Sequence, residues 1–105
     1  MEDTIVVVEY DPRWPQIFEV EKVRILGVIG EKVVAIEHMG STAIPGLGAK
    51  PIIDIMVAVP GLDDAPGCVQ PLQGIGYEYV PEFEAFIPER RYFRKGTPRS
   101  HHLHM

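Results

Sequence analysis

Cysteine is nearly absent from this sequence, since Cys68 is the only one in 105 residues. A disulfide framework and a thiolate zinc cluster both require several cysteines, so both are excluded, and we expect a cytoplasmic protein. The sequence also lacks an apolar run of the roughly 18 residues that a membrane-spanning helix needs. Because the chain opens with acidic residues rather than a basic segment, we expect neither a secretory signal nor membrane association.

Positive charge is scarce, with 10 Lys and Arg against 15 Asp and Glu and a net charge of −5. We therefore expect no general binding of nucleic acids. The cations are concentrated at one end, because residues 89–105 hold five of them, one acid and three of the four histidines. A cationic end on an acidic body indicates a local anion site, although a solvated basic strand would give the same pattern.

The length and the order of elements predict a single domain over residues 1–105, of the α+β or α/β class. Strand patterns cover residues 4–10, 32–38, 51–59, 77–80, 91–94 and 101–104. Helical patterns cover residues 12–29 and, interrupted by prolines, 62–73. We expect one mixed sheet with helices mainly on one face, and strands 32–38 and 51–59 adjacent at its centre. An open sheet edge would also permit a homodimer.

The segment after the strand at 32–38 contains Gly40, Ser41 and Thr42. Glycine has no β-carbon, so a phosphate can approach the backbone closely there. Free N–H groups and the two hydroxyls could then hold the phosphate oxygens. An ordinary tight turn is the competing interpretation of the same residues.

Asp54 interrupts the most apolar strand pattern in the chain, residues 51–59. Side chains alternate along a strand, so Asp54 shares one face with Ile52 and Met56. An ionised carboxylate in such a strand is costly unless it is paired, bound to a metal or at the solvent edge. We favour a metal-binding or catalytic role over a structural salt bridge to Arg91 or Arg94.

His102 and His104 fall on one face of the last strand pattern, about 7 Å apart along the strand. Two imidazoles at this spacing can share a divalent metal or bind a phosphate. A solvated histidine tract near the end of a chain is the alternative.

Arg91, Arg94 and Lys95 are candidates for phosphate contacts, because Arg presents a planar fork of donors. A charged edge strand that resists aggregation would look the same. If these cations bind phosphate, Arg91, Arg94 and at least one of the two histidines should face the same cleft as Gly40-Ser41.

Three stretches together resemble the GrpB-like family, namely residues 10–18, residues 38–56, and residues 90–96 followed by 101–104. The resemblance implies a sheet related to the palm of the DNA polymerase beta-like nucleotidyltransferases. Members of the family usually continue beyond the last strand, so we expect this chain to be C-terminally short relative to them.

The resemblance also implies roles for particular residues. It assigns Gly40 and Ser41 to the triphosphate and Asp54 to a divalent metal, Mg²⁺ or Mn²⁺. Met56 stands where a second metal-binding carboxylate is expected, and a thioether does not suit Mg²⁺. His102 or His104 could replace the missing ligand, which would favour a transition metal.

Two hypotheses for function rank about equally. The first is a nucleotidyltransferase that holds a nucleoside triphosphate on Gly40-Ser41, with its phosphates on Lys50, Arg91 and Arg94 and a metal on Asp54. The second is a non-catalytic module that binds a nucleotide or another phosphorylated small molecule.

A third hypothesis ranks behind these two. It is a single-metal phosphohydrolase that uses His38, Asp54, His102 and His104. This hypothesis requires the four side chains to lie close enough together to bind one metal ion.

Overall fold

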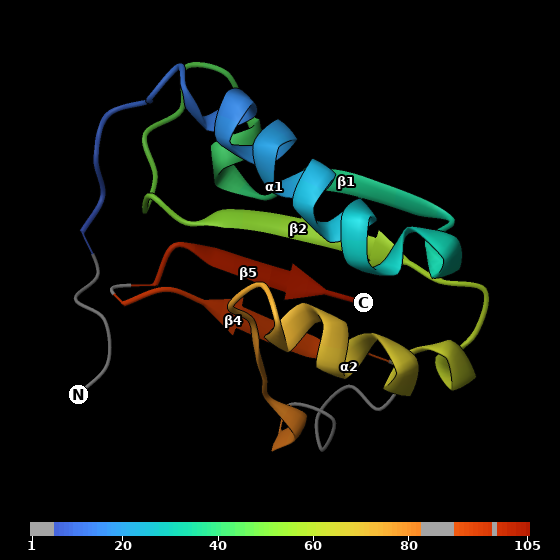
Figure 1. Cartoon of the computed structure of the whole chain (residues 1–105). Helices are drawn as coiled ribbons and strands as arrows, with labels where there is room; N and C mark the ends of the chain where they lie inside the picture. Colours follow the sequence, from blue (N-terminus) through green and yellow to red (C-terminus); the bar gives the residue numbers. More distant parts are fainter. Residues whose placement is uncertain (1–5, 83–89, 98) are drawn as a thin grey trace.

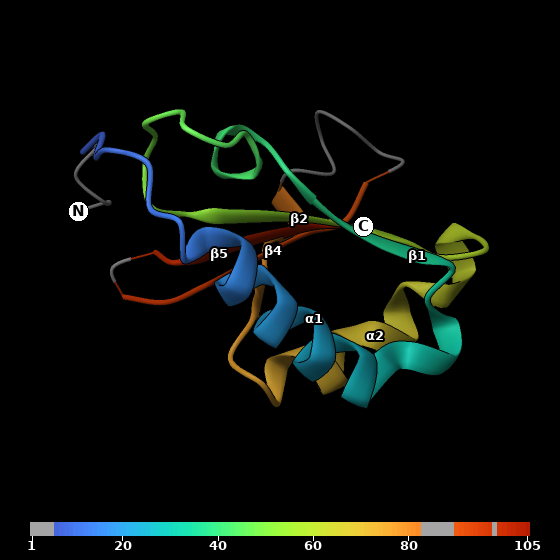
Figure 2. The same cartoon turned by 90° about the horizontal axis from the view of Figure 1, so that it is seen from above.

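The computed structural model describes residues 6–82, 90–97 and 99–105 (Figure 1). One five-stranded sheet carries both α-helices on the same face, which Figure 2 shows from above. The helices are α1 (Trp14–Ile29) and α2 (Pro66–Gln73). The strands are β1 (Ala35–Met39), β2 (Ile53–Ala58), β3 (Glu78–Tyr79), β4 (Tyr92–Lys95) and β5 (His101–His104). This arrangement confirms the expected α+β class with helices on one side of a mixed sheet.

The sheet has the order β1-β2-β5-β4-β3. Strand β2 pairs antiparallel with β1 and parallel with β5, while the remaining pairs are antiparallel. The prediction that the first two of these strands are adjacent is confirmed, but β1 lies at the edge rather than the centre. The burial of the two strands agrees with this order. Strand β1 contributes one buried side chain, Ile36, whereas β2 buries Ile53, Ile55 and Val57.

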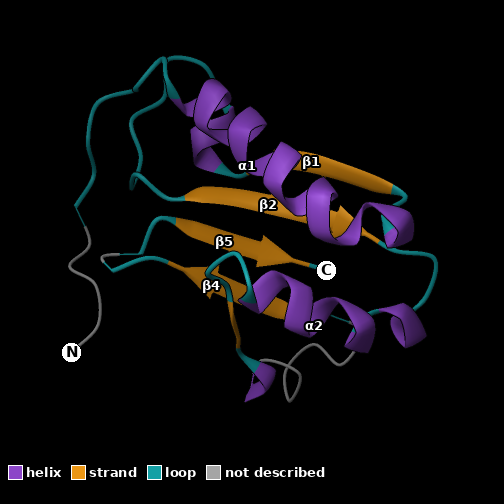
Figure 3. Cartoon of the chain, viewed as in Figure 1, coloured by secondary structure: helices purple, strands orange, loops and turns teal. Residues whose placement is uncertain are grey.

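Helix α1 lies along the sheet (Figure 3). One continuous stripe of its side chains is buried. The stripe consists of Trp14, Phe18, Glu21, Ile25 and Ile29. These positions are three or four residues apart, which is the spacing of one helix face. The sequence predicted a helix over residues 12–29. The structure starts it at Trp14 and leaves Ile17 exposed, and the polar Glu21 takes the buried position.

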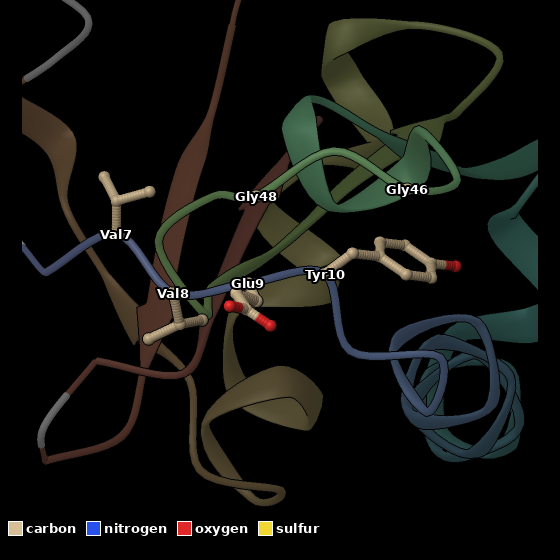
Figure 4. Close-up of a pocket in the computed structure, with 6 residues that line it drawn as sticks. All are labelled: Val7, Val8, Glu9, Tyr10, Gly46 and Gly48. Carbon is tan, nitrogen blue, oxygen red and sulfur yellow. The ribbon is translucent and has the colours of Figure 1, made fainter.

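The strand predicted over residues 4–10 is not formed in its described part, residues 6–10. Only Val8 makes a bridge there, exchanging two backbone hydrogen bonds of 2.9 and 3.0 Å with Ala49. Its partner is a loop that passes so close that a β-carbon on Gly48 would lie 2.8 Å from the Val8 carbonyl oxygen. Figure 4 shows the hollow between this segment and the loop. Residues 4 and 5 lie outside the described part of the chain.

Among the described residues, no helix has both the length and the apolar character required to cross a lipid bilayer.

Candidate functional site

The face of the sheet opposite the helices carries an acid and two histidines. Strand β5 pairs with β2 so that Asp54 stands beside His102 and Met56 beside His104. Asp54 Oδ1 lies 3.2 Å from His102 Nδ1 and 3.9 Å from His104 Nε2. The three side chains are 25–30% exposed, so solvent and small molecules reach them. The structure therefore brings together the three residues that the sequence selected as metal ligands.

A cavity of about 80 Å³ lies beside Asp54. This volume exceeds the roughly 10–15 Å³ that a single water needs. Five of the predicted site residues contribute to its wall. The lining consists of Ser41, Thr42, Ala49, Lys50, Ile52, Asp54 and His102.

Gly40 allows the turn after β1 to press against Asp54. Its backbone has φ +76° and ψ −166°, a conformation that is essentially restricted to glycine. A β-carbon at this position would lie 2.7 Å from Asp54 Oδ2. The glycine thus brings the start of the short 3₁₀ turn Ser41–Ala43 to the carboxylate.

The hydroxyl of Thr42 is engaged within the protein. Thr42 is buried, and its Oγ1 donates to the Ile52 carbonyl at 3.3 Å. Because that uses its only proton, His38 Nε2–H is the donor in the 2.9 Å contact with Thr42 Oγ1. Thr42 therefore connects the turn to the residue before β2 by a hydrogen bond. Ser41 carries the other hydroxyl of this turn, and that hydroxyl can contact a ligand.

His38 faces away from the acid and the two histidines. Its ring stacks on Phe18 of α1, with centroids 4.9 Å apart and planes 15° from parallel. Burial lowers the pKa of His38, more than the nearby Asp54 and Glu19 raise it, so a neutral ring is favoured. The convergence that the phosphohydrolase hypothesis requires is not formed, because β1 turns His38 toward the helices.

The two arginines selected from the sequence lie outside the cavity lining. Arg94 stands beside His102 in the sheet, but its guanidinium donates to Glu78 at 3.0 and 3.4 Å. This pairing lowers the pKa of Glu78 and raises that of Arg94. Arg91 precedes β4 and directs Nη1 to the Arg90 carbonyl at 3.0 Å. Lys50 is the cation that the structure places at the cavity.

Glu37 carries a carboxylate that was not among the candidate site residues predicted from the sequence. Met56 lies on the face of β2 that carries Asp54, and β1 pairs Glu37 directly with Met56. A second acid is therefore absent from β2, where Met56 stands, but one is present on the neighbouring strand β1. Only the register of β1 against β2 shows this, and the long loop between the two strands prevents that register from being read from the sequence.

No group of three or more His, Cys, Asp or Glu side chains in the described ranges is arranged to hold a metal ion. His102 Nδ1 and His104 Nε2 both lie near the same oxygen of Asp54. The donor set itself, one carboxylate and two imidazoles, suits Mn²⁺ or a transition metal better than Mg²⁺.

A model of the GrpB protein family matches residues 4–105. A UPF0157 protein of Pseudomonas aeruginosa is 42% identical over 99% of this chain and 44% of its own length. The crystal structure of the conserved protein GrpB from Enterococcus faecalis superposes with a TM-score of 0.86 at 40% identity, over 94% of this chain and 59% of that one.

Part of a dephospho-CoA kinase of Mycolicibacterium paratuberculosis is also similar, at 31% identity over 88% of this chain and 25% of the kinase. The chain spans about half the length of the curated UPF0157 relative described above. The family model, the sequence relatives and the solved structure agree with the residues that suggested the resemblance. The chain belongs to the GrpB protein family.

Proposed function

We propose that this domain binds a phosphorylated small molecule, with a nucleotide as the expected class, and that a phosphate group of the ligand lies in the cavity of about 80 Å³ beside Asp54. The observation that carries the proposal is the composition of that cavity. Lys50 supplies a positive charge and Ser41 a hydroxyl, next to the turn that begins after Gly40. These are groups that commonly hold phosphate oxygens.

A divalent cation completes this proposal, because Asp54 would otherwise repel a phosphate. The carboxylate of Asp54 and the imidazole of His102, 3.2 Å apart, offer an oxygen and a nitrogen ligand. His104 is a further ligand on the same face, and burial lowers its pKa, which favours the neutral ring that a metal requires. A cation held there would bind the protein on one side and the phosphate on the other.

The nucleotide class is supported by two likenesses. The residues around Gly40 and Asp54 resemble the phosphate and metal segments of DNA polymerase beta-like nucleotidyltransferases. The mycobacterial relative carries the name dephospho-CoA kinase, which is compatible with a nucleotide-related ligand for the shared segment.

Nucleotidyl transfer is the second candidate, and Glu37 is the observation that favours it. The two-metal mechanism needs carboxylates around a pair of cations, and Met56 cannot serve as one. Glu37 stands beside Met56 on the exposed face and is the acid best placed to substitute. If transfer occurs, Glu37→Gln should abolish Mn²⁺-dependent release of pyrophosphate from ATP and leave ATP binding intact.

Calorimetric titration of the protein with ATP, with and without Mn²⁺, tests the binding proposal. We expect binding that requires Mn²⁺ and weakens about tenfold in Lys50→Gln, since one charge-assisted contact is lost. Lys32→Gln is the matched control, because Lys32 lies in the turn after α1 and packs on Gly67. No binding in either condition, or equal losses in both variants, would refute the proposal.

A further inference from the structure

Helix α1 presents a largely apolar stripe to solvent, on the side opposite its buried stripe. This outward stripe consists of Gln16, Val20, Val23 and Gly27, which follow one another three or four residues apart and are all exposed. Val20 and Val23 are 57% and 69% exposed. Figures 1 and 2 show no described element over this side of the helix. The outward stripe therefore lacks the charged residues that a solvated helix face normally carries.

The composition of the outward stripe indicates a contact surface. A helix that is apolar on opposite sides is normally covered on both of them. Valine and glycine are weaker helix formers than alanine, leucine or lysine, so helix propensity does not account for Val20, Val23 and Gly27. The charges beside the stripe indicate what covers it.

Residues of opposite charge lie on the two sides of the outward stripe. Glu19 lies on the side of β1, where it lines a hollow together with His38. Arg24 lies on the other side, where it lines a groove together with Lys95. Within the described residues, no ion pair joins Glu19 to a base or Arg24 to an acid. Both charges are therefore available to a partner.

The spacing of these charges fits a second copy of the same helix. When two copies pack in parallel around a two-fold axis, symmetry brings equivalent residues to the same level. In the heptad notation of coiled coils, Val20 and Val23 occupy positions a and d, Glu19 the preceding g and Arg24 the following e. Salt bridges between parallel helices join position g of one helix to position e of the other. The parallel arrangement thus places Glu19 beside Arg24 of the partner subunit, and the two-fold axis repeats this pair.

An antiparallel pair of α1 helices does not satisfy the same charges. That arrangement brings the Glu19 side of one helix against the Glu19 side of the other, and the Arg24 side against the Arg24 side. Like charges then face each other on both sides, which disfavours the interface. Charge complementarity therefore selects the parallel arrangement.

The shape of the helix layer leaves room for this approach. A β-carbon built on Gly27 meets no atom within 4 Å, so the backbone of α1 is open to a neighbour there. Helix α2 lies beside α1 rather than over it, and the sheet lies behind both helices (Figures 1 and 2). A second copy on the outward stripe meets the helix layer only.

We propose that the outward stripe of α1 is the interface of a parallel, two-fold homodimer. Val20 and Val23 pack on their counterparts, and Glu19 of each copy pairs with Arg24 of the partner subunit. Exposed ion pairs add little affinity, so the valines supply the affinity and the charges set the orientation. One helix of 16 residues offers less than the roughly 1,200 Å² that stable complexes bury, so the dimer is reversible and forms at high concentration.

Sedimentation equilibrium of the 105-residue chain, from about 10 μM to about 1 mM, tests this interface. We expect the average mass to rise from that of a monomer toward that of a dimer. Val23→Asp brings two carboxylates together at the centre of the interface and should remain monomeric. Val34→Asp is the matched control, because Val34 is 68% exposed but lies next to β1 rather than on α1. It should dimerise as the wild type does.

Reversal of charge tests the orientation of the two helices. Glu19→Arg places two cations together on each side and should weaken association about tenfold. Adding Arg24→Glu restores opposite charges in a parallel pair, so the double variant should dimerise as the wild type does. In an antiparallel pair, the wild type and both variants would have like charges on each side and would associate equally.

Three results would overturn the proposal. They are a wild type that is monomeric at about 1 mM, equal association of Val23→Asp and Val34→Asp, and a double variant that associates no better than Glu19→Arg. The charge variants keep the test decisive if Val23→Asp fails to fold. ATP binding should be the same in Glu19→Arg as in the wild type, because the Asp54 cavity lies on the opposite face of the sheet. The dimer and the proposed function can therefore fail separately.

Discussion

Gly40 and Asp54 are in direct contact across β1 and β2, and the contact leaves no room for a β-carbon. Such an atom on Gly40 would stand 2.7 Å from Asp54 Oδ2 and 3.3 Å from Asp54 Cβ. The glycine therefore sets where the carboxylate can lie, with Oδ1 turned toward His102 at 3.2 Å. The position of the candidate site depends on this pair.

Gly40→Ala should both destabilise the protein and displace Asp54. The backbone strain of a non-glycine residue in this conformation costs about 1–3 kcal/mol. The new β-carbon also pushes on the carboxylate, so we expect ATP binding with Mn²⁺ to be lost. Urea unfolding and calorimetry measure the two effects.

Gly46→Ala separates strain from contact, because Gly46 has φ +82° but nothing within 4 Å of a built β-carbon. We expect Gly46→Ala to lower stability and keep ligand binding. If both variants bind ATP equally well, the Gly40–Asp54 contact does not shape the site.

Three histidines that are fully or partly buried should make the protein less stable in mild acid. Burial lowers the pKa values of His38, His101 and His104 in the folded state. The unfolded chain, in which histidine has a pKa of about 6.5, therefore takes up protons first as the pH falls. The contribution of the neutral histidines to the free energy of unfolding is complete well above the unfolded-state pKa. It is lost as the pH falls from about 7 toward 5.

His38→Gln tests this contribution, because glutamine can still donate to Thr42 but does not titrate. The free energy of unfolding, from urea denaturation at several pH values, should fall less steeply in the variant than in the wild type. An unchanged slope would show that His38 makes no contribution.

Glu21→Gln should be far more damaging than the removal of an exposed acid. Glu21 is buried against Lys95, and breaking such a pair costs about 3–5 kcal/mol because it leaves a buried charge uncompensated. The comparison is Glu78→Gln, which breaks the exposed pair with Arg94 and should cost little stability, because solvent screens an exposed pair. Chemical denaturation gives both values, and similar losses would mean that Glu21 is not held as described.

The sequence predicted which side chains share a face of a strand better than it predicted which strands pair with each other. Alternation was enough to place Asp54 with Met56, and His102 with His104, because it is a local property of an extended chain. The parallel pairing that joins Asp54 to His102 links residues far apart in the chain. No local pattern reports such a pairing, and the edge position of β1 was missed for the same reason.

The burial of Glu21 shows that sequence patterns do not fully predict which side chains of a helix are buried. On α1 the apolar side chain of Ile17 is exposed, whereas the acidic side chain of Glu21 is buried. The partners that stabilise Glu21 are Tyr77 and Lys95, which lie 56 and 74 residues later. A buried acid is recognised only once the residues that compensate it are placed beside it.

The central claim, that Asp54 and the adjacent histidines hold a cation at the cavity, is tested most directly with Mn²⁺. Paramagnetic Mn²⁺ broadens the NMR signals of nuclei close to it. Substoichiometric Mn²⁺ should broaden the imidazole signals of His102 and His104 in the wild type much more strongly than that of His101, whose ring lies on the opposite face of β5. In Asp54→Asn, which keeps the shape but weakens the ligand, this broadening should disappear. Absence of selective broadening in the wild type, or equal broadening in Asp54→Asn, would contradict the account.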